Sequence, residues 1–246
     1  MSEPGHNRMA DQYFEASYGR GNLLTPEQFT LACEYFRRDY KSVMPSRKDA
    51  AILDVGCGAG HFLYYLKTDG YQNYFGIDVS SGQIAYCQKH ITDRVKLVDA
   101  VSFLEQNPQR YDLIVAHDVG EHIPKAEVMK FLDCIFRSLK PEGRLILRVP
   151  NMSNPFGLDA RYNDFTHEIG YTAKSLYQVL YVVGFRDIQI LPPREIPVRN
   201  YRNFIRKHLV KCLHRVIRFC YYIQDYTVPE NLDKNIVAVA RKTGHE

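Results

Sequence analysis

The stretch Ile52-Leu-Asp-Val-Gly-Cys-Gly-Ala-Gly-His-Phe62 carries the local signals that decide the fold. An apolar run ends beside an acidic residue, glycines then alternate with small residues, and an amphipathic run follows; this pattern predicts a strand, a tight turn and a helix. Glycine suits such a turn because it reaches positive φ at low cost and lets backbone N–H groups approach a ligand closely. We therefore expect a nucleotide-type binding loop here.

Strand-like and helix-like runs alternate along most of the chain. Further strands are expected over 74–78, 95–98, 111–116, 144–149, 185–191 and 235–240. The apolar period between them predicts helices: Pro124 opens one that runs to Leu139, and Ser102 with Glu105 forms a capping box for another. Thr25 and Thr172 are expected to cap the starts of two further helices, and Gly184 to end the second of them. The alternation predicts an α/β fold, with a seven-stranded, mostly parallel sheet, right-handed crossovers and helices on both faces.

Two of the expected strands end in a carboxylate. Asp78 lies 22 residues after Gly56, and Asp99 follows the next strand. In an open parallel sheet the ligand crevice lies beyond the carboxyl ends of the strands, where an acidic side chain can accept hydrogen bonds from the hydroxyls of a ribose. We expect this role for Asp78. The alternative is an ordinary solvated acid at a strand end.

Several motifs occur in an order typical of one enzyme family: Asp54 to Gly60, Asp78, Asp99-Ala100, the strand ending in His117-Asp118, and Leu139-Lys-Pro-Glu-Gly143. Over roughly residues 50–190 the chain resembles the class I S-adenosyl-L-methionine (SAM)-dependent methyltransferases. The resemblance implies a Rossmann-like fold with SAM as cofactor, Asp99 and Ala100 at the adenine, and His117 near the adenine edge. The cofactor-binding residues it implies are Asp54, Gly56, Cys57, Gly58, Asp78, Val79, Asp99, Ala100 and His117.

A narrower resemblance concerns the acceptor. Glu121-His-Ile-Pro124 and Asp164-Phe-Thr-His-Glu168 resemble the small methyltransferases associated with bacterial surface polysaccharides and lipid-linked glycans. This resemblance implies polysaccharide biosynthesis and O-methylation of a sugar hydroxyl on a glycan or lipid-linked glycan. The alternatives are O-methylation of a small aromatic or quinone-type acceptor, which an apolar acceptor pocket would favour, and a non-catalytic partner protein that keeps the fold.

Two histidines are candidates for the base that a sugar hydroxyl needs, since that hydroxyl is a poor nucleophile at neutral pH and histidine has an ordinary pKa of about 6.5. His167 lies in the long loop 150–171, where an acceptor would bind, and we expect it to be the base. His122, with Glu121 beside it, is expected to shape the methyl-transfer site. The alternative for each histidine is that it caps a helix or braces the loop. The acids Asp118, Asp164 and Glu168 form no tight ligand pattern, so no metal site is expected.

The chain is expected to divide into a helical cap (1–48), a SAM-binding core (49–191), an insertion (192–234) and a last strand with a short tail (235–246). The insertion contains an apolar stripe, and between Val198 and Gln224 it has seven Lys or Arg residues and no acid. This predicts a basic amphipathic helix over 200–223. Such a helix can lie on an anionic membrane, at about 1 kcal/mol per basic residue, or pack on its own domain or across a dimer. No aromatic-interleaved recognition motif is present, so no nucleic-acid partner is expected.

Composition limits the class of protein further. The chain has 246 residues, 45% of them hydrophobic, and a net charge of +4. It shows no apolar leader and no run of eighteen apolar residues, so we expect a cytoplasmic protein, with peripheral contact at the inner membrane face left open. Six scattered cysteines without a C-x-x-C pair argue against a zinc ribbon or a disulfide framework.

Overall fold

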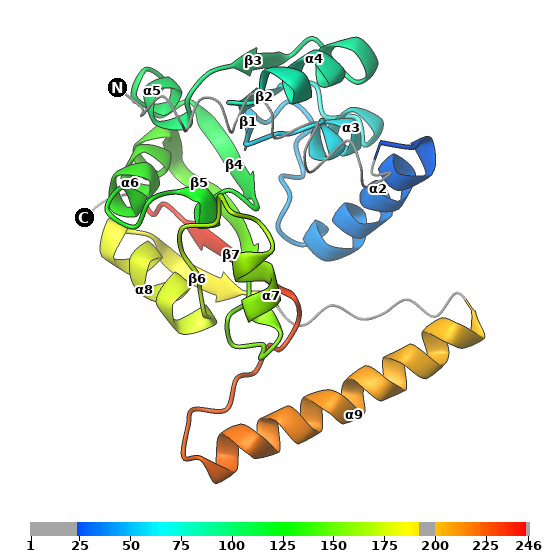
Figure 1. Ribbon diagram of the computed structural model, residues 1–246. Coiled ribbons are helices and arrows are strands. Elements are labelled where there is room, and N and C mark those ends of the chain that lie inside the picture. Colours follow the sequence, from blue (N-terminus) through cyan, green and yellow to red (C-terminus); the bar gives the residue numbers. More distant parts are fainter. Residues whose placement is uncertain (1–23, 192–199, 245–246) are drawn as a thin grey trace.

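The computed structural model describes residues 24–191 and 200–244. A seven-stranded sheet with the order β3-β2-β1-β4-β5-β7-β6 forms its centre (Figure 1). The strands are β1 (Ile52–Val55), β2 (Tyr74–Asp78), β3 (Val95–Leu97), β4 (Tyr111–His117), β5 (Leu139–Pro150), β6 (Arg186–Ile190) and β7 (Asn235–Arg241). Strands β1 to β5 are parallel, and β7 runs antiparallel to both β5 and β6. The Rossmann-like sheet expected from the sequence is therefore confirmed.

Helices cover both faces of the sheet (Figure 1). The helices of the structure are α2 (Pro26–Tyr40), α3 (His61–Thr68), α4 (Ser81–His90), α5 (Ala100–Glu105), α6 (Val128–Ser138), α7 (Gly157–Tyr162), α8 (Ala173–Val183) and α9 (Tyr201–Ile223), and α9 extends away from the sheet. Side chains of α2, α3 and α4 pack into one apolar cluster, and those of α5, α6 and α8 pack into another. Strand β1 serves both clusters, because Ile52 points to the first and Leu53 to the second. The carboxyl ends of the parallel strands are left open as a site.

Caps end several helices where the sequence predicts. The Thr25 hydroxyl accepts from the Gln28 N–H at the start of α2, and Thr172 and Ser175 form a capping box at the start of α8. Gly184 ends α8 with a φ of +117°, which glycine reaches without strain. These boundaries are set by local chemistry, which is why the sequence predicts them correctly.

Three predicted boundaries are wrong. Helix α5 begins at Ala100 with Asp99 as its N-cap, so Ser102 lies inside the helix instead of opening it. Helix α6 begins at Val128, four residues after Pro124, because a 3-10 helix and a turn come between β4 and α6. Leu139 belongs to β5, where it pairs with Tyr111 ahead of a bulge at 140–143. A strand partner thus overrides the helical period at this residue.

Helix α9 confirms the predicted helix in the insertion, but its apolar stripe does not pack on its own domain. Ile217 is its buried residue, whereas Leu209 and Val216 of the stripe are 65% and 54% exposed. No helix among residues 24–191 and 200–244 is long and apolar enough to cross a membrane. Residues 1–23 of the predicted cap and 192–199 of the predicted insertion lie outside the described residues, and the domain boundaries stay predictions.

Candidate functional site

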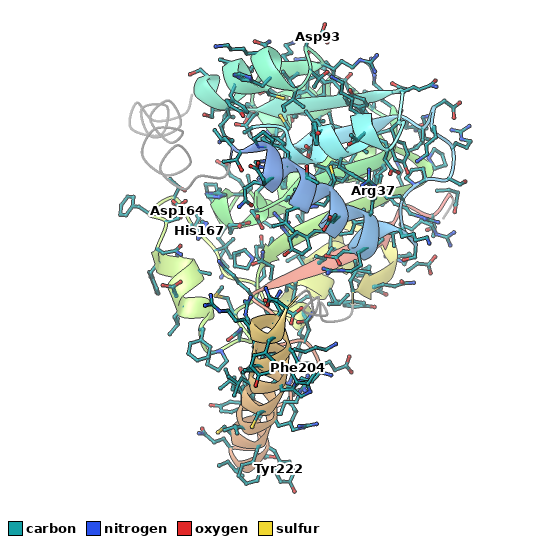
Figure 2. The ribbon with its side chains drawn as sticks, turned by 90° about the vertical axis from the view of Figure 1, so that its right-hand side faces the viewer. Arg37, Asp93, Asp164, His167, Phe204 and Tyr222 are labelled. Atoms are coloured by element: carbon teal, nitrogen blue, oxygen red, sulfur yellow. The ribbon has the colours of Figure 1, made fainter. Side chains whose placement is uncertain are left out.

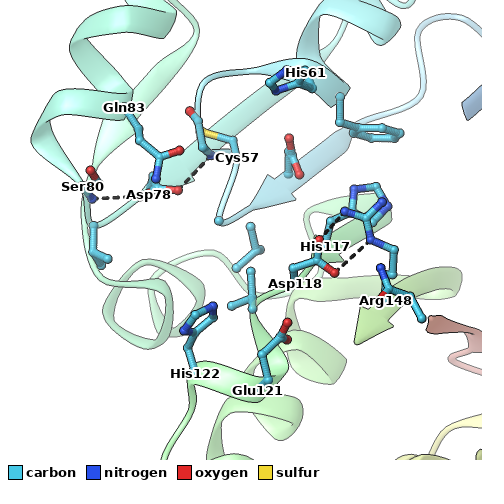
Figure 3. Close-up of a pocket in the computed structure, with 18 of the residues that line it drawn as sticks. Cys57, His61, Asp78, Ser80, Gln83, His117, Asp118, Glu121, His122 and Arg148 are labelled. Atoms are coloured by element: carbon cyan, nitrogen blue, oxygen red, sulfur yellow. Dashed lines mark hydrogen bonds and ion pairs between the residues drawn. The ribbon is translucent and has the colours of Figure 1, made fainter. Parts of the chain in front are cut away.

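A pocket of about 840 Å³ lies beyond the carboxyl ends of β1, β2, β3 and β4. Its walls come from the glycine loop, from helix α2, and from the loops 118–123 and 160–167. Figure 3 shows side chains around this space, among them Cys57 of the glycine loop, Asp78 at the end of β2, and His122 of the loop 118–123. The volume is in the range of pockets that hold a cofactor or a drug-sized ligand.

Glycine is required at two positions of the loop. Gly56 has a φ of +67° and Gly58 a φ of +54°, both in the left-handed region. A Cβ on Gly56 would lie 2.3 Å from Cγ2 of Val119, and a Cβ on Gly58 would lie 2.6 Å from Oε1 of Gln83. The backbone of the loop therefore lies directly against the pocket walls, as the sequence predicts for a ligand cradle.

Asp78 holds the glycine loop in place. Its Oδ2 accepts the N–H of Gly58 at 2.9 Å, and its Oδ1 accepts the N–H of Ser80 at 2.8 Å (Figure 3). Burial raises the pKa of this carboxyl, while the N–H groups of Ser80 and Gly58 lower it. Each carboxylate oxygen has a second acceptor position. Asp78 can therefore brace the loop and still bind ribose hydroxyls, and that second role remains a prediction.

Asp54 presents an unsatisfied acceptor to the pocket. It is only 2% exposed, and its Oδ2 has no hydrogen-bond partner among the described residues. Burial, and after it the neighbouring Asp78, raises the pKa of Asp54 well above its ordinary value. A buried acceptor without a partner fits a ligand that brings a donor. Cys57 is a buried thiol whose pKa burial raises well above its ordinary value, so it lines the pocket as a small neutral group.

The predicted adenine-binding residues line the end of the pocket near β3. The Oδ1 of Asp99 accepts the N–H of Ser102 at 2.9 Å, and Ala100 is the first residue of α5. Val79 is 53% exposed and lies beside Asp78. An apolar side chain, a carboxylate and a helix start suit an aromatic base with an exocyclic amine. With the glycine cradle and the unsatisfied Asp54, they make this half of the pocket a fit for SAM.

His117 lines the same pocket. It ends β4, which is separated from β3 by β1 and β2. Its Nε2 lies 2.7 Å from the hydroxyl of Tyr40, and its ring stacks on Phe36 with centroids 5.3 Å apart. His117 thus lies apart from Asp99 and Ala100, and its expected position near the adenine edge stays a prediction. Helix α2 holds His117 on the other side of the glycine loop.

Arg148 and Gln83 are among the pocket residues that the sequence analysis misses. Arg148 of β5 donates from Nε to Oδ1 of Asp118 at 3.0 Å, and a second bond joins its guanidinium to Oδ2 (Figure 3). A lone arginine within the apolar run Leu145–Val149 was the available signal. Gln83, the third residue of α4, is buried with Oε1 unpartnered in the described structure, and the sequence analysis assigns it no role.

The three predicted catalytic residues come together. Glu121 and His122 lie on the 3-10 helix Gly120–His122, and His167 lies in the loop after α7. The N–H groups of Glu168 and Ile169 donate to the carbonyl of Glu121 at 2.7 and 3.2 Å, which ties this loop to the 3-10 helix. The rings of His122 and His167 consequently lie 4.7 Å apart, centroid to centroid.

Hydrogen bonds hold both imidazoles, and that of His167 assigns its tautomer. Nδ1 of His167 lies 2.6 Å from the carbonyl of Ala160, which can only accept, so Nδ1 carries the hydrogen and Nε2 keeps a lone pair. Nδ1 of His122 lies 2.8 Å from the hydroxyl of Thr166, which itself donates to Asp164 at 2.6 Å. Burial, and then His167, lowers the pKa of His122. Figure 2 shows His167 beside Asp164 in this loop.

Glu121 is the most enclosed member of the group. It is 1% exposed, and its Oε2 has no partner within residues 24–191 and 200–244. Burial, followed by the charge of Asp118, raises the pKa of Glu121 to about 8. Together with His122 and His167 it offers one ligand atom per residue, all within 4.8 Å, a set that could hold a metal ion. The sequence-based expectation of no metal site is drawn from Asp118, Asp164 and Glu168, and it stays a prediction.

The acceptor side of the pocket is lined by polar side chains. Asn163 and Asp164 come from the end of α7 and the loop after it, while Lys234 and Asn235 come from the start of β7. Asn151, which follows β5, fixes the segment before β7, since its buried side-chain amide donates to the carbonyls of Asn231 and Asp233 at 3.0 and 3.1 Å. No local pattern predicts Lys234 or Asn235, because only the fold brings them to the pocket.

Comparison with known proteins places this site in a family. The methyltransferase domain family matches residues 30–190. The ubiquinone biosynthesis O-methyltransferase of Bradyrhizobium diazoefficiens is 31% identical over 123 residues, which are 49% of this chain and 47% of that protein. The mitochondrial ubiquinone biosynthesis O-methyltransferase of Rattus norvegicus is 32% identical over 108 residues, which are 41% of this chain and 30% of that protein. The matched stretch thus spans half or less of the length of these relatives.

Solved structures share the fold. A SAM-dependent methyltransferase from Archaeoglobus fulgidus superposes with a TM-score of 0.66 at 20% identity, covering 96% of this chain and 99% of that one. A possible histamine N-methyltransferase from Thermotoga maritima superposes with a TM-score of 0.63 at 14% identity, covering 95% and 100%. The chain belongs to the methyltransferase domain family and has the fold of SAM-dependent methyltransferases.

Proposed function

We propose that this protein transfers the methyl group of SAM to a hydroxyl of a sugar, on a glycan or a lipid-linked glycan. The observation that carries the proposal is the position of His167. It faces the same pocket as the glycine loop, with a lone pair on Nε2, among the polar side chains Asn163, Asp164, Lys234 and Asn235. Polar groups of this kind suit a hydroxyl-rich acceptor better than an apolar one.

The cofactor half supplies binding and alignment. SAM supplies an already activated methyl group on its sulfonium. Asp54 offers its unsatisfied oxygen to a donor of the ligand, Asp78 has acceptor positions for the ribose, and Asp99 lies at the adenine end. Alignment of the acceptor oxygen with the methyl group can supply a large part of the rate enhancement, because it replaces a bimolecular encounter with a fixed geometry.

His167 acts as the base in this proposal. Its Nε2 accepts the proton of the acceptor hydroxyl while Nδ1 stays bonded to the Ala160 carbonyl, which fixes the ring and its tautomer. His122 is a positioning residue, held by Thr166 and Asp164 against the ring of His167. Neutral Glu121 places no negative charge beside the acceptor oxygen while that oxygen loses its proton.

A second candidate acceptor is the phenolic hydroxyl of a quinone precursor. The observation that favours it is the name of the curated relatives above, which are ubiquinone biosynthesis O-methyltransferases. A phenol has a pKa of about 10, so it needs less help from a base than a sugar hydroxyl does. The two acceptors therefore differ in how strongly transfer depends on His167.

Transfer of labelled methyl from SAM tests the proposal. The full chain is incubated with methyl-labelled SAM and fractions of an unmethylated bacterial extract, and label is followed into glycan, lipid, protein and small-molecule fractions. We expect label in the glycan or lipid-linked glycan fraction. Label confined to small aromatic molecules would replace the sugar by the phenolic acceptor. Measurable SAM binding with transfer into none of the fractions would favour a non-catalytic SAM-binding protein.

His167→Gln tests the base. We expect kcat to fall by roughly 10²- to 10⁴-fold on a sugar acceptor, with little change in SAM affinity. His90→Gln is the matched control, because His90 lies on the exposed end of α4 outside the pocket lining. An unchanged kcat in His167→Gln would reduce His167 to a structural residue.

A further inference from the structure

Helix α9 is attached to the rest of the protein by one narrow face. Ile217 is its buried residue, and the hydroxyl of Tyr221 on the same side donates to the carbonyl of Ser153 at 2.8 Å. The guanidinium of Arg218 donates to the carbonyls of Pro229 and Glu230 at 3.3 and 2.7 Å. These contacts hold the helix beside the segment that leads into β7, and they leave its opposite face in solvent (Figure 1).

The opposite face is a wide apolar stripe. Its members are large side chains that are each between 39% and 76% exposed: Tyr201, Phe204, Ile205, Leu209, Leu213, Val216, Phe219, Tyr222 and Ile223. Figure 2 shows Phe204 and Tyr222 projecting from the part of α9 that extends away from the sheet. An apolar surface of this extent on one helix marks an interaction site.

Basic side chains border the apolar stripe on both sides. With 3.6 residues per turn, Lys211 and Arg215 follow one edge, and Arg202 and Arg206 follow the other. No Asp or Glu occurs between Val198 and Gln224. An exposed apolar face with cationic borders matches an anionic lipid surface, where acyl chains receive the apolar side chains and headgroups receive the charges.

Charge decides against the other occupants. A second copy of α9 would bring its own cationic borders to the stripe, with no acid in either helix to pair with them. A nucleic acid would satisfy the charges but leave the aromatic and aliphatic side chains in water. We propose that α9 docks on the surface of an anionic phospholipid bilayer, lying in the plane of the headgroups.

Docking through α9 would bring the acceptor side of the pocket near the bilayer. Tyr221 bonds to Ser153, and Asn154 donates to the carbonyl of Leu232 at 2.8 Å, so the loop before α7 and the segment before β7 are joined to the helix. These two segments lead to Asn163 and Lys234 in the pocket lining. Docking on a bilayer would place the pocket where a lipid-linked acceptor lies. The identity of that acceptor rests on the proposed function, whereas the docking itself does not.

Sedimentation with vesicles tests the docking. The full chain is mixed, without SAM or acceptor, with vesicles of phosphatidylcholine alone or of phosphatidylcholine with phosphatidylglycerol. We expect binding to the anionic vesicles that falls at least tenfold in Leu209→Glu/Phe219→Glu and in Lys211→Glu/Arg215→Glu, and that weakens in high salt. Because neither acceptor nor cofactor is present, failure here is independent of failure of the methyl-transfer proposal.

A matched double variant controls for charge and folding. Leu97→Glu/Val182→Glu changes the net charge by as much as Leu209→Glu/Phe219→Glu does, but at side chains on other elements that are 51% and 66% exposed. It is expected to bind vesicles like the wild type. Circular dichroism shows whether each variant keeps its helices. Equal binding by wild type and Leu209→Glu/Phe219→Glu would overturn the proposal.

Two further results would assign the face to another partner. Absence of vesicle binding together with a dimer in light scattering that Leu209→Glu/Phe219→Glu dissociates would assign it to a second copy. Absence of vesicle binding together with retention of a duplex DNA probe would assign it to nucleic acid.

Discussion

Glu121 shows how a neighbourhood changes the chemistry of one side chain. In the sequence it is an acid next to a histidine, yet the fold places it in the interior, near Asp118 and against the loop that carries His167. Burial and Asp118 raise its pKa to about 8, so its carboxyl is largely neutral at pH 7. A neutral acid beside two imidazoles is a donor to a ligand oxygen, which the residue type alone does not predict.

Glu121→Gln is expected to stabilise the protein increasingly as pH rises. In the unfolded chain Glu121 ionises near its ordinary pKa of 4.5, whereas in the folded protein it ionises near 8. Between these two values the unfolded state gains by releasing the proton and the folded state does not, so the wild type loses stability. Glutamine has no such loss. The variant's advantage in free energy of unfolding should grow by up to about 1.4 kcal/mol per pH unit over this window.

Urea unfolding at several pH values measures this difference. Glu127→Gln serves as the control, because Glu127 is exposed just before α6 and its replacement should leave the pH dependence unchanged. A Glu121→Gln advantage that stays constant from pH 4.5 to 8 would contradict the raised pKa.

The glycine loop shows how one element depends on its packing partner. Gly56 and Gly70 share a left-handed backbone, with φ of +67° and +82°, but their surroundings differ. A Cβ on Gly56 would overlap Val119 at 2.3 Å, whereas a Cβ on Gly70 would meet nothing within 4 Å. Glycine at position 70 thus serves only the turn, whereas glycine at position 56 also allows the backbone to lie against the side chain of Val119.

Gly56→Ala is therefore expected to cost more stability than Gly70→Ala. Alanine at either position carries the left-handed penalty of about 1–2 kcal/mol, and at Gly56 the overlap with Val119 adds about 1–3 kcal/mol. Urea unfolding of both variants measures the difference. Gly56→Ala combined with Val119→Ala should recover part of the added loss. Equal losses in the two single variants would show that Val119 moves aside without cost.

The whole pocket is assembled from segments far apart in the chain. The cofactor half comes from the ends of β1, β2 and β3, while the acceptor half joins the loop after α7 to residues at the start of β7. Asn151, which follows β5, fixes the segment before β7 through its buried amide. Only the folded molecule contains such a site, so a ligand of the pocket should stabilise the folded state over the unfolded one.

SAM is expected to raise the melting temperature of the protein. At a concentration 100 times its Kd a ligand of the folded state adds about 2.7 kcal/mol, which corresponds to a rise of roughly 5–10 °C for a chain of this size. In Asp78→Asn the amide N–H₂ would face the N–H of Gly58 or Ser80, and the shift should largely disappear. The control Asp93→Asn changes an exposed acid, labelled in Figure 2, and should keep the full shift. A full shift in Asp78→Asn would remove Asp78 from the cofactor site.

Local chemistry alone determined much of this protein. The run from Ile52 to Phe62 predicts its strand, turn and helix, and Thr25 and Thr172 mark helix starts. The alternating apolar runs predict the order of strands and helices along the chain. These features depend on residues that are neighbours in the chain, since caps and periodicity act over a few residues. The carboxylates Asp54, Asp78 and Asp99 can also be found from the sequence, because each stands at or next to the end of a predicted strand.

Tertiary structure decided the rest, because it depends on contacts between distant residues. The sequence predicts the helix in the insertion but not that Ile217 would be buried and the Leu209 side exposed, since both faces contain apolar residues. Nor does the sequence predict that Tyr40 of α2 bonds to His117, at the end of a strand that β1 and β2 separate from β3. Lys234 reaches the acceptor pocket because β7 inserts beside β5. Pairing and packing across the sheet, which no local pattern records, fixed these positions.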